Sequence, residues 1–211
     1  TERIRFATLV LVLGYHHPLE IAKRYGTLDL LSGGRVVLGV GVGSLAGEFD
    51  LLGVPFEGRG DRADDAISAL RSSLSTTRPA YDGRFYRYGD LALQPCAVQP
   101  HVPIWVGGRT VRSLRRAIAL GDGWMPFGLN VSRLRDMLVR AELPPGFEVV
   151  LSTGRTVDPI ADPDGLRRRL NDLRDVGATA ITATVAADSP DHYCEQLAAL
   201  REIADDLQGV P

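Results

Sequence analysis

Two glycine clusters have the residue types and spacing to bind an anionic ligand. The first covers residues 38–48 (LGVGVGSLAGE) and the second covers residues 103–110 (PIWVGGRT). In each, an apolar run typical of a buried strand ends in glycines, which allow a ligand to approach the backbone closely. Both clusters are therefore candidate binding loops at the ends of strands.

The second cluster offers the clearer mechanism. Gly107 and Gly108 would let a phosphate approach the backbone, and the N–H groups of the helix that follows would point at it. Arg109, which we place in the first turn of that helix, would add a full positive charge. Strand, glycine and helix junctions are also common as plain turns, and this alternative stays open.

The first cluster matches a dinucleotide-binding pattern only in part. Gly41, Gly43 and Ala46 satisfy G-x-G-x-x-G/A, and Asp61 lies about 20 residues further on. The pattern also requires a helix and a second strand that ends at the acid, and residues 53–60 (GVPFEGRG) interrupt both. The remaining alternatives are a ligand contact and a tight turn at the end of a strand.

Two adjacent histidines, His16 and His17, follow the first predicted strand. Neighbouring side chains on a regular element point in different directions, and no Asp, Glu or Cys accompanies them at ligand spacing, so no metal site is expected. A role as proton donor or substrate hydrogen bonder is favoured for one of them. Ser44 lies outside any G-x-S-x-G pattern, so covalent catalysis has no support.

Apolar runs alternate with segments of helical period, which is the α/β pattern. Each run is continuous, as is typical of parallel strands covered on both faces. The predicted strands are residues 4–13, 35–42, 102–106, 123–125, 147–152 and 180–185.

Helices with apolar faces are predicted between these strands. Pro18, Asp61 and Pro163 are predicted to open helices, and Gly33, Gly121 and Gly177 to follow helix ends. The inward faces are Ala63, Ala66, Ile67, Leu70 and Leu74, then Leu166, Leu170, Leu173 and Val176, then Tyr193, Leu197, Leu200, Ile203 and Leu207.

Six βα units fit either an open doubly wound sheet or most of an eight-fold barrel. The chain opens on Thr1, and its first strand follows within three residues, so we expect an N-terminal portion with two further units. We predict a single domain over residues 1–211 with an insertion at about 76–100. In that insertion, residues 81–86 (YDGRFY) predict a small hairpin.

Composition narrows the partners. The chain has 211 residues, 45% of them hydrophobic and 24% charged, and this is typical of a globular domain. A net charge of −2 argues against nucleic-acid and anionic-membrane binding, and no apolar run is long enough to span a bilayer. Two cysteines build neither a disulfide framework nor a cysteine zinc site, which favours the cytoplasm. A small-molecule substrate is the expected partner.

A set of spaced motifs resembles one enzyme family. The motifs are residues 8–13 (TLVLVL), His17-Pro18, residues 27–35 (TLDLLSGGR), residues 39–44 with Glu48-Phe49 and Arg59, residues 106–108 and residues 116–124. Together they resemble the luciferase-like flavin and deazaflavin oxidoreductases, and the nearest likeness is to the coenzyme F420-dependent subgroup. The resemblance covers about residues 3–128.

The resemblance implies a (β/α)8 TIM barrel that starts here at its third strand and carries an insertion with a small hairpin. It implies transfer of a hydride between the deazaflavin F420 and a small organic substrate, and commonly a homodimer. An FMN-dependent monooxygenase of the same family is the alternative. A barrel that binds the cofactor without turnover is a third possibility.

The resemblance also implies the cofactor-binding residues. A non-prolyl cis peptide at about Leu9-Val10 would support the ring, and the phosphate end would approach the second glycine cluster. The predicted set is Leu9, Val10, Val12, Gly43, Ser44, Gly47, Gly107, Gly108, Arg109, Phe127 and Gly128. Many members have an acid or amide where this sequence has Ser44 and Gly47, so no catalytic residue is assigned.

Overall fold

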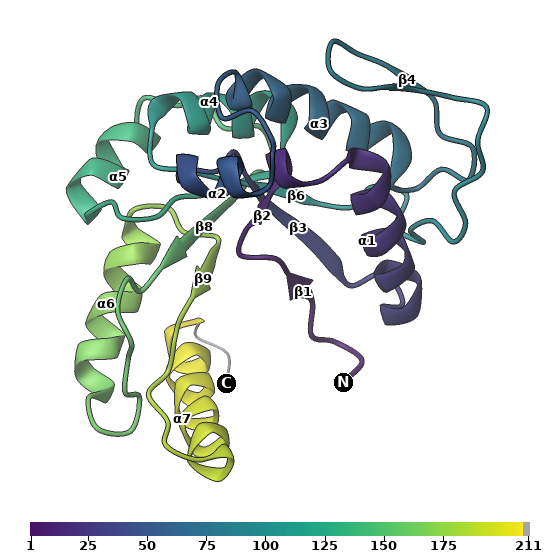
Figure 1. Ribbon diagram of the computed structural model, residues 1–211. Helices are drawn as coiled ribbons and strands as arrows, with labels where there is room; N and C mark the ends of the chain where they lie inside the picture. Colours follow the sequence, from purple (N-terminus) through teal and green to yellow (C-terminus); the bar gives the residue numbers. More distant parts are fainter. Residues whose placement is uncertain (209–211) are drawn as a thin grey trace. The chain divides into compact units, whose positions relative to one another are not determined.

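The computed structural model describes residues 1–208 of the 211-residue chain. It falls into two compact units, residues 1–124 and the residues from 125 onward (Figure 1). Strands and helices alternate in both units, so the predicted α/β class is confirmed.

Parallel strands form the centre of the first unit. β1 (Phe6–Ala7) and β2 (Leu11–Val12) both pair with β3 (Val36–Gly41), and β3 pairs in parallel with β6 (Ile104–Gly107). Every residue of β3 and β6 is buried, as their continuous apolar runs predicted. β7 (Gly123–Met125) begins in this unit and ends in the second.

The prediction that the first strand is covered on both faces is wrong. Residues 4–13 form β1 and β2 with a break between them, and both residues of β1 are exposed. β1 pairs with β3 on one side, and Phe6 of β1 lies under the guanidinium of Arg35, 5.0 Å from the ring centroid. Within the described residues β1 has β3 as its one strand neighbour, and this leaves its side chains exposed.

Helices cover the strands of the first unit. α1 packs against α3, and α4 packs against β6. The predicted apolar face of α3 is buried. The helices are the 3-10 helix η1 (Leu13–Tyr15), α1 (Pro18–Ser32), α2 (Ala46–Leu51), α3 (Arg59–Ser73) and α4 (Val111–Leu120).

Most predicted helix boundaries are confirmed. Pro18 opens α1, and Gly33 ends it in the left-handed region with φ 69°. Asp61 does not open α3, which begins two residues earlier because Gly58 takes φ 69° at its start. Asp61 lies instead in the first turn of α3, where the helix dipole stabilises a negatively charged carboxylate.

The predicted hairpin is confirmed as β4 (Tyr81–Asp82) and β5 (Arg87–Tyr88), which pair antiparallel. Asp65 of α3 holds its tip: the carboxylate accepts hydrogen bonds from Tyr81 Oη at 2.6 Å and from the backbone N–H of Phe85 at 2.6 Å. Burial alone would raise the pKa of Asp65, but these hydrogen bonds outweigh it and lower the pKa.

The second unit contains the parallel pair β8 (Glu148–Ser152) and β9 (Ala180–Thr182), with Val150 opposite Ala180. Leu166, Leu170 and Ile203 form a core cluster between two helices. Tyr193 and Leu197 were predicted to face inward, but they are 46% and 41% exposed because this core meets the later turns of their helix. The helices are α5 (Val131–Leu138), α6 (Pro163–Asp175) and α7 (Pro190–Gln208).

Two carboxylates hold the starting ends of β3 and β6. Asp29, fully buried on α1, accepts hydrogen bonds from Val36 N, Val98 N, Gln99 N and Gln99 Nε2 at 2.7 to 3.2 Å. Asp122 accepts from Ile104 N, Arg71 and His101 at 2.5 to 2.7 Å. Burial would raise the pKa of Asp122, but these three donors lower it.

Replacing Asp29 by Asn should lower the free energy of unfolding by about 2–3 kcal/mol, since the amide loses the charge and turns N–H groups toward backbone donors. Chemical denaturation with urea measures this. Asp82→Asn, which changes an exposed carboxylate on β4, is the control and should change the value by less than about 0.5 kcal/mol. Equal unfolding midpoints for the two variants would contradict the role of Asp29.

Candidate functional site

The C-terminal ends of β2, β3 and β6 lie at one edge of the first unit. Val12 is opposite Gly41, and Val40 is opposite both Leu11 and Val106. Gly107 follows Val106 directly and so ends at the same edge. Active sites of parallel α/β folds lie at this edge, and the structure brings the first unit's two glycine clusters together there.

Phe49 is the packing centre of this edge. Its ring is fully buried, and a Cβ on Gly43 or Gly14 would lie 2.6 or 2.8 Å from its atoms. Gly43 takes φ +79°, and its Cβ would also meet Val12 at 2.9 Å. The missing side chain of Gly43 therefore makes room for the protein's own Phe49 and Val12, which favours the tight-turn interpretation of this glycine.

Arg59 of α3 stabilises the turn that contains Gly43. Its Nε donates a hydrogen bond to the carbonyl of Gly43 at 3.0 Å. Its guanidinium lies 3.7 Å from the ring centroid of Phe56, and Phe56 in turn meets Phe49 edge to face at 5.2 Å. The turn after β3 is thus fixed through both its backbone and its aromatic neighbours.

Tyr15 and Glu48 add a polar link across the edge. Tyr15 Oη donates a hydrogen bond to Glu48 Oε2, and the Tyr15 ring meets Phe49 at a centroid distance of 4.9 Å. The hydrogen bond to the Glu48 carboxylate raises the pKa of Tyr15 to about 12, and desolvation adds to the shift.

The two histidines differ in their contacts. His17 Nδ1 accepts a hydrogen bond from Leu19 N at 3.2 Å and so caps α1, and the ring lies edge to face with Tyr86 at 5.3 Å. His16 Nδ1 lies 3.2 Å from Glu20 Oε2. His17 therefore has a structural role at Nδ1, and the proposed proton-handling role of either histidine stays a prediction.

The second glycine cluster meets α4 differently from the prediction. Thr110 is the N-cap and forms a capping box with Ser113, so Arg109 lies before the cap, outside the first helical turn. Gly108 takes φ +139°, and a Cβ there would lie 2.5 Å from Ser113 Cβ. In this box the Thr110 hydroxyl accepts a hydrogen bond from the backbone N–H of Ser113. The N–H groups of Val111 and Arg112 have no acceptor within the helix.

The predicted irregularity of the first strand is confirmed. The Leu9-Val10 peptide bond is cis, and it lies between β1 and β2. Val10 Cγ2 occupies the space above Gly41, where a Cβ would lie 2.9 Å away. Leu9 is 66% exposed and Val10 39%, so apolar side chains remain accessible beside the edge.

The other predicted site residues are exposed. Ser44 and Gly47 are exposed, and a Cβ on Gly47 would meet no atom within 4 Å. Phe127 and Gly128 lie in the second unit after β7, where Phe127 is exposed and Gly128 has φ +64° and no atom within 4 Å of a Cβ. Their cofactor contacts stay predictions.

The rejected dinucleotide pattern fails for one of the two reasons given. A short helix, α2, does follow the first glycine cluster, contrary to the prediction. However, Asp61 lies on α3, so no strand ends at the acid as the pattern requires.

The sequence reasoning missed the interactions that hold this edge. Tyr15 was not singled out, and Glu48, Phe49 and Arg59 entered only as parts of a motif. One signal was available for α4: Thr110, three residues before Ser113, resembles a capping box. The contact between Phe49 and Gly14, which lies 35 residues earlier in the chain, has no comparable local signal.

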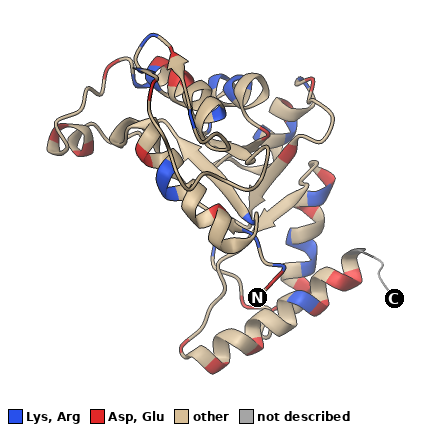
Figure 2. Cartoon of the chain, turned by 90° about the vertical axis from the view of Figure 1, so that its right-hand side faces the viewer, with Lys and Arg blue, Asp and Glu red and all other residues tan. Residues whose placement is uncertain are grey.

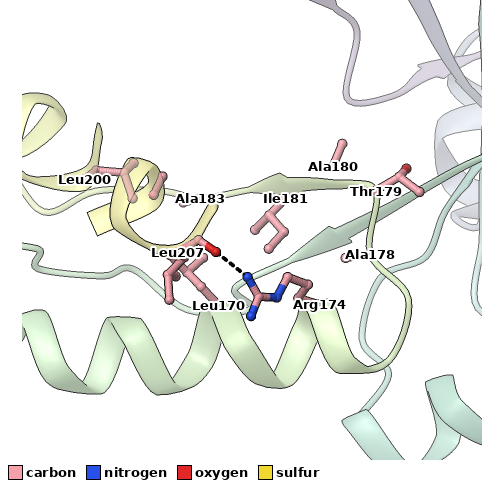
Figure 3. A pocket seen from close by; sticks show the side chains of 10 residues that line it. Leu170, Arg174, Ala178, Thr179, Ala180, Ile181, Ala183, Leu200 and Leu207 are labelled. Carbon is pink, nitrogen blue, oxygen red and sulfur yellow. Dashed lines mark hydrogen bonds between the residues drawn. The ribbon is translucent and has the colours of Figure 1, made fainter. Parts of the chain in front are cut away.

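A separate cavity of about 450 Å³ lies within the second unit (Figure 3). α6, β9 and α7 line it, largely with Ala, Leu and Ile side chains. Arg174 is the charged residue of the lining, and its Nη1 donates to the carbonyl of Leu207 at 2.5 Å. None of the predicted cofactor-binding residues contributes to this cavity.

Charged residues of both signs are mixed along the helices (Figure 2). Within residues 1–208, no three side chains of His, Cys, Asp or Glu gather closely enough to hold a metal ion. No helix in this part of the chain combines the length and apolar character needed to cross a bilayer.

Comparison with known proteins decides the family. The family of luciferase-like monooxygenases matches residues 1–144. The chain belongs to this family. The match includes both glycine clusters, the cis peptide and the Phe49 contacts, so the edge described above is part of the luciferase-like region.

The relatives that carry functional names include a monooxygenase and a reductase. An uncharacterised protein of Mycobacterium tuberculosis is 38% identical over 142 residues, which are 67% of this chain and 49% of the relative. The FMNH(2)-dependent dimethylsulfone monooxygenase of Pseudomonas putida is 30% identical over 64% of this chain and 38% of its own. The 5,10-methylenetetrahydromethanopterin reductase of Archaeoglobus fulgidus is 30% identical over 61% and 37%. The chain thus spans half or less of these relatives.

Solved structures confirm the predicted fold class, a luciferase-like α/β barrel fold. The monooxygenase RslO1 from Streptomyces bottropensis matches with a TM-score of 0.81 at 20% identity, over 96% of this chain and 78% of that one. The coenzyme F420-dependent tetrahydromethanopterin reductase from Methanopyrus kandleri matches with a TM-score of 0.73 at 16% identity, over 95% and 82%.

Gly43→Ala should lower the free energy of unfolding by about 2–4 kcal/mol, because the new methyl overlaps Phe49 and the backbone is held at positive φ. Gly47→Ala is the control: it adds a methyl to α2 in open space and should be neutral or slightly stabilising. Thermal and urea unfolding measure both. Equal losses for the two variants would disprove the packing role of Gly43.

The Tyr15 phenol should ionise near pH 12, and Glu48→Gln should return its pKa toward 10, because the phenolate then faces no carboxylate. Since the folded pKa is raised, the bond contributes stability below pH 10 and loses it as the pH rises through 12. NMR of tyrosine labelled with 13C at Cζ, assigned with Tyr15→Phe, follows this titration. An unchanged titration in Glu48→Gln would refute the link.

Proposed function

We propose that the protein is a luciferase-like oxidoreductase that moves a hydride between coenzyme F420 and a small organic substrate. One observation carries the proposal: an accessible apolar segment and the N-terminus of a helix lie at the same edge of adjacent parallel strands. A ring with an anionic tail needs both, one for the ring and one for the phosphate.

The apolar part of the edge fits a planar ring. Leu9 and Val10 are partly exposed, and Val12 ends β2 beside Gly41. The open space above Gly47 leaves room next to α2. Apolar side chains with few polar groups are the usual lining of a cofactor pocket.

The start of α4 fits the phosphate end. The N–H groups of Val111 and Arg112 have no acceptor within the helix, and the helix dipole favours an anion there. Arg109, just before the cap, is exposed and adds a positive charge within reach of the same end. The capping box keeps this end of the helix formed with no ligand bound.

When bound, F420 supplies the hydride chemistry at C5 of its deazaflavin ring. The protein's own residues bind and orient it. Arg59, Phe49 and the Tyr15–Glu48 hydrogen bond hold the turn after β3 against the end of β2. A fixed orientation of the ring lowers the entropic part of the activation barrier, because the reacting atoms are already aligned.

An FMN-dependent monooxygenase is the second candidate, supported by the Pseudomonas putida relative named as FMNH(2)-dependent. The Archaeoglobus fulgidus relative and the Methanopyrus kandleri structure support the reductase side. FMN ends in a phosphate monoester with more charge than the phosphodiester of F420, so a deep cup of donors favours FMN. The exposed position of Arg109 outside the helix favours the longer F420 tail.

Equilibrium binding separates the candidates. Purified protein is titrated with F420 and with FMN, and quenching of cofactor fluorescence gives each dissociation constant. Tighter binding of F420 with turnover of a substrate supports the proposal, and tighter binding of FMN supports the monooxygenase. Binding without turnover on a panel of small organic substrates supports the third possibility, a barrel that only binds the cofactor.

The organisation of the whole protein belongs to the same proposal. We propose a single domain over residues 1–211 with an insertion at about 76–100, assembled as a homodimer in the cytoplasm. Sedimentation equilibrium of the purified protein measures the subunit count, and a monomer at micromolar concentration would exclude the homodimer.

Arg109→Ala should weaken F420 binding by about 10-fold, since an exposed charge-assisted contact lies at the low end of its usual contribution. Turnover at saturating cofactor should change little, because the loss falls on binding. The difference should shrink as salt rises. Unchanged affinity at low ionic strength would remove Arg109 from the site, and a loss of saturated turnover alone would place it on the substrate side.

A further inference from the structure

We propose that Tyr15 and Glu48 are positioning residues for the cofactor: their hydrogen bond fixes α2 and the turn before it relative to the end of β2. The inference rests on the proposed function, because the segments that the bond connects carry three of the predicted cofactor contacts. Val12 lies three residues before Tyr15, Gly47 directly precedes Glu48, and Ser44 lies four residues before Glu48.

α2 depends on such links because it cannot hold its place alone. It has six residues, far fewer than a helix needs to be stable by itself. Its N-cap, Leu45, makes no side-chain capping bond, and Phe49 is its one buried residue. The segment is therefore anchored by its contacts with the rest of the unit.

Two neighbouring side chains of α2 provide the anchors. The Phe49 ring is inserted between Gly14 and Gly43, and Glu48 accepts the hydrogen bond from Tyr15. The Tyr15 ring touches the Phe49 ring as well, at 4.9 Å and an interplanar angle of 68°. Tyr15 thus contacts both anchors from η1, which follows β2 without a gap.

Arg59 holds the backbone of the turn after β3, and the buried Phe49 ring holds α2 at one point. A further contact, at Glu48 in the first turn of α2, is needed to fix the direction of this short helix. Without the hydrogen bond, Ser44 and Gly47 would sample several positions, and the cofactor would have to order them on binding. Ordering a segment on binding lowers affinity.

The test compares Tyr15→Phe and Glu48→Gln with Tyr81→Phe as the matched control. Tyr81 also donates a hydrogen bond from its phenol to a carboxylate, Asp65 at 2.6 Å, but it belongs to the hairpin. Dissociation constants for F420 and FMN come from fluorescence quenching, and the absorption spectrum of the bound cofactor is recorded at saturation. Melting temperatures report on the fold.

Tyr15→Phe and Glu48→Gln should each weaken binding of the preferred cofactor by about three- to fivefold, the range of an exposed charge-assisted pair. The spectrum of the bound cofactor should also move toward that of the free cofactor, because the ring is held less tightly. Tyr81→Phe should change neither. A role in folding alone would not move the spectrum at saturation.

Three other outcomes overturn the inference in different ways. If the unmodified protein binds neither cofactor, the proposed function fails and the inference fails with it. If the protein binds a cofactor and both variants match Tyr81→Phe, the inference is wrong and the proposed function stands. If both variants lose binding only because they unfold, the hydrogen bond is a requirement of the fold and not a positioning device.

Discussion

The burial of the Phe49 ring is the constraint on which the candidate site depends. The ring fills the space over Gly14, which follows β2, and over Gly43, which follows β3. It therefore excludes a side chain at either position. Because protein interiors are closely packed, this one ring sets the distance between the end of β2 and the turn after β3. Arg59 on the carbonyl of Gly43 and the hydrogen bond to Glu48 then fix the direction of that turn.

At the N-terminal ends of β3 and β6, buried or half-buried carboxylates hold the strands in place. Asp29 accepts the N–H of Val36, the first residue of β3, and Asp122 accepts the N–H of Ile104, the first residue of β6. Each carboxylate brings further donors from another part of the chain to the start of its strand. Rigid starting ends let the C-terminal ends carry glycines and exposed apolar side chains without loss of register, as active sites on rigid scaffolds require.

The sequence predicted the elements whose hydrophobic pattern reflects burial. It failed to predict the elements whose position depends on single side-chain contacts. Continuous apolar runs located the strands, and Pro18 and Pro163 located helix starts, because these signals are local. The cis peptide at Leu9-Val10 followed from the family resemblance and not from the residues. α2 was missed because its place depends on the burial of Phe49 against Gly43 nearby and Gly14, which lies 35 residues earlier in the chain. The position of Arg109 was wrong because Thr110, one residue later, is the better N-cap.

The site glycines divide into two kinds by what occupies the place of a side chain. At Gly43 and Gly108 that space belongs to Phe49 with Val12 and to Ser113, so these glycines serve the protein's own packing. At Gly47 it is open, so the absence of a side chain there has no packing reason within the described chain. A glycine in a helix costs stability relative to alanine. Under the proposed function, the open space at Gly47 would let a cofactor approach α2 closely, which makes Gly47 a stronger candidate for cofactor contact than Gly43.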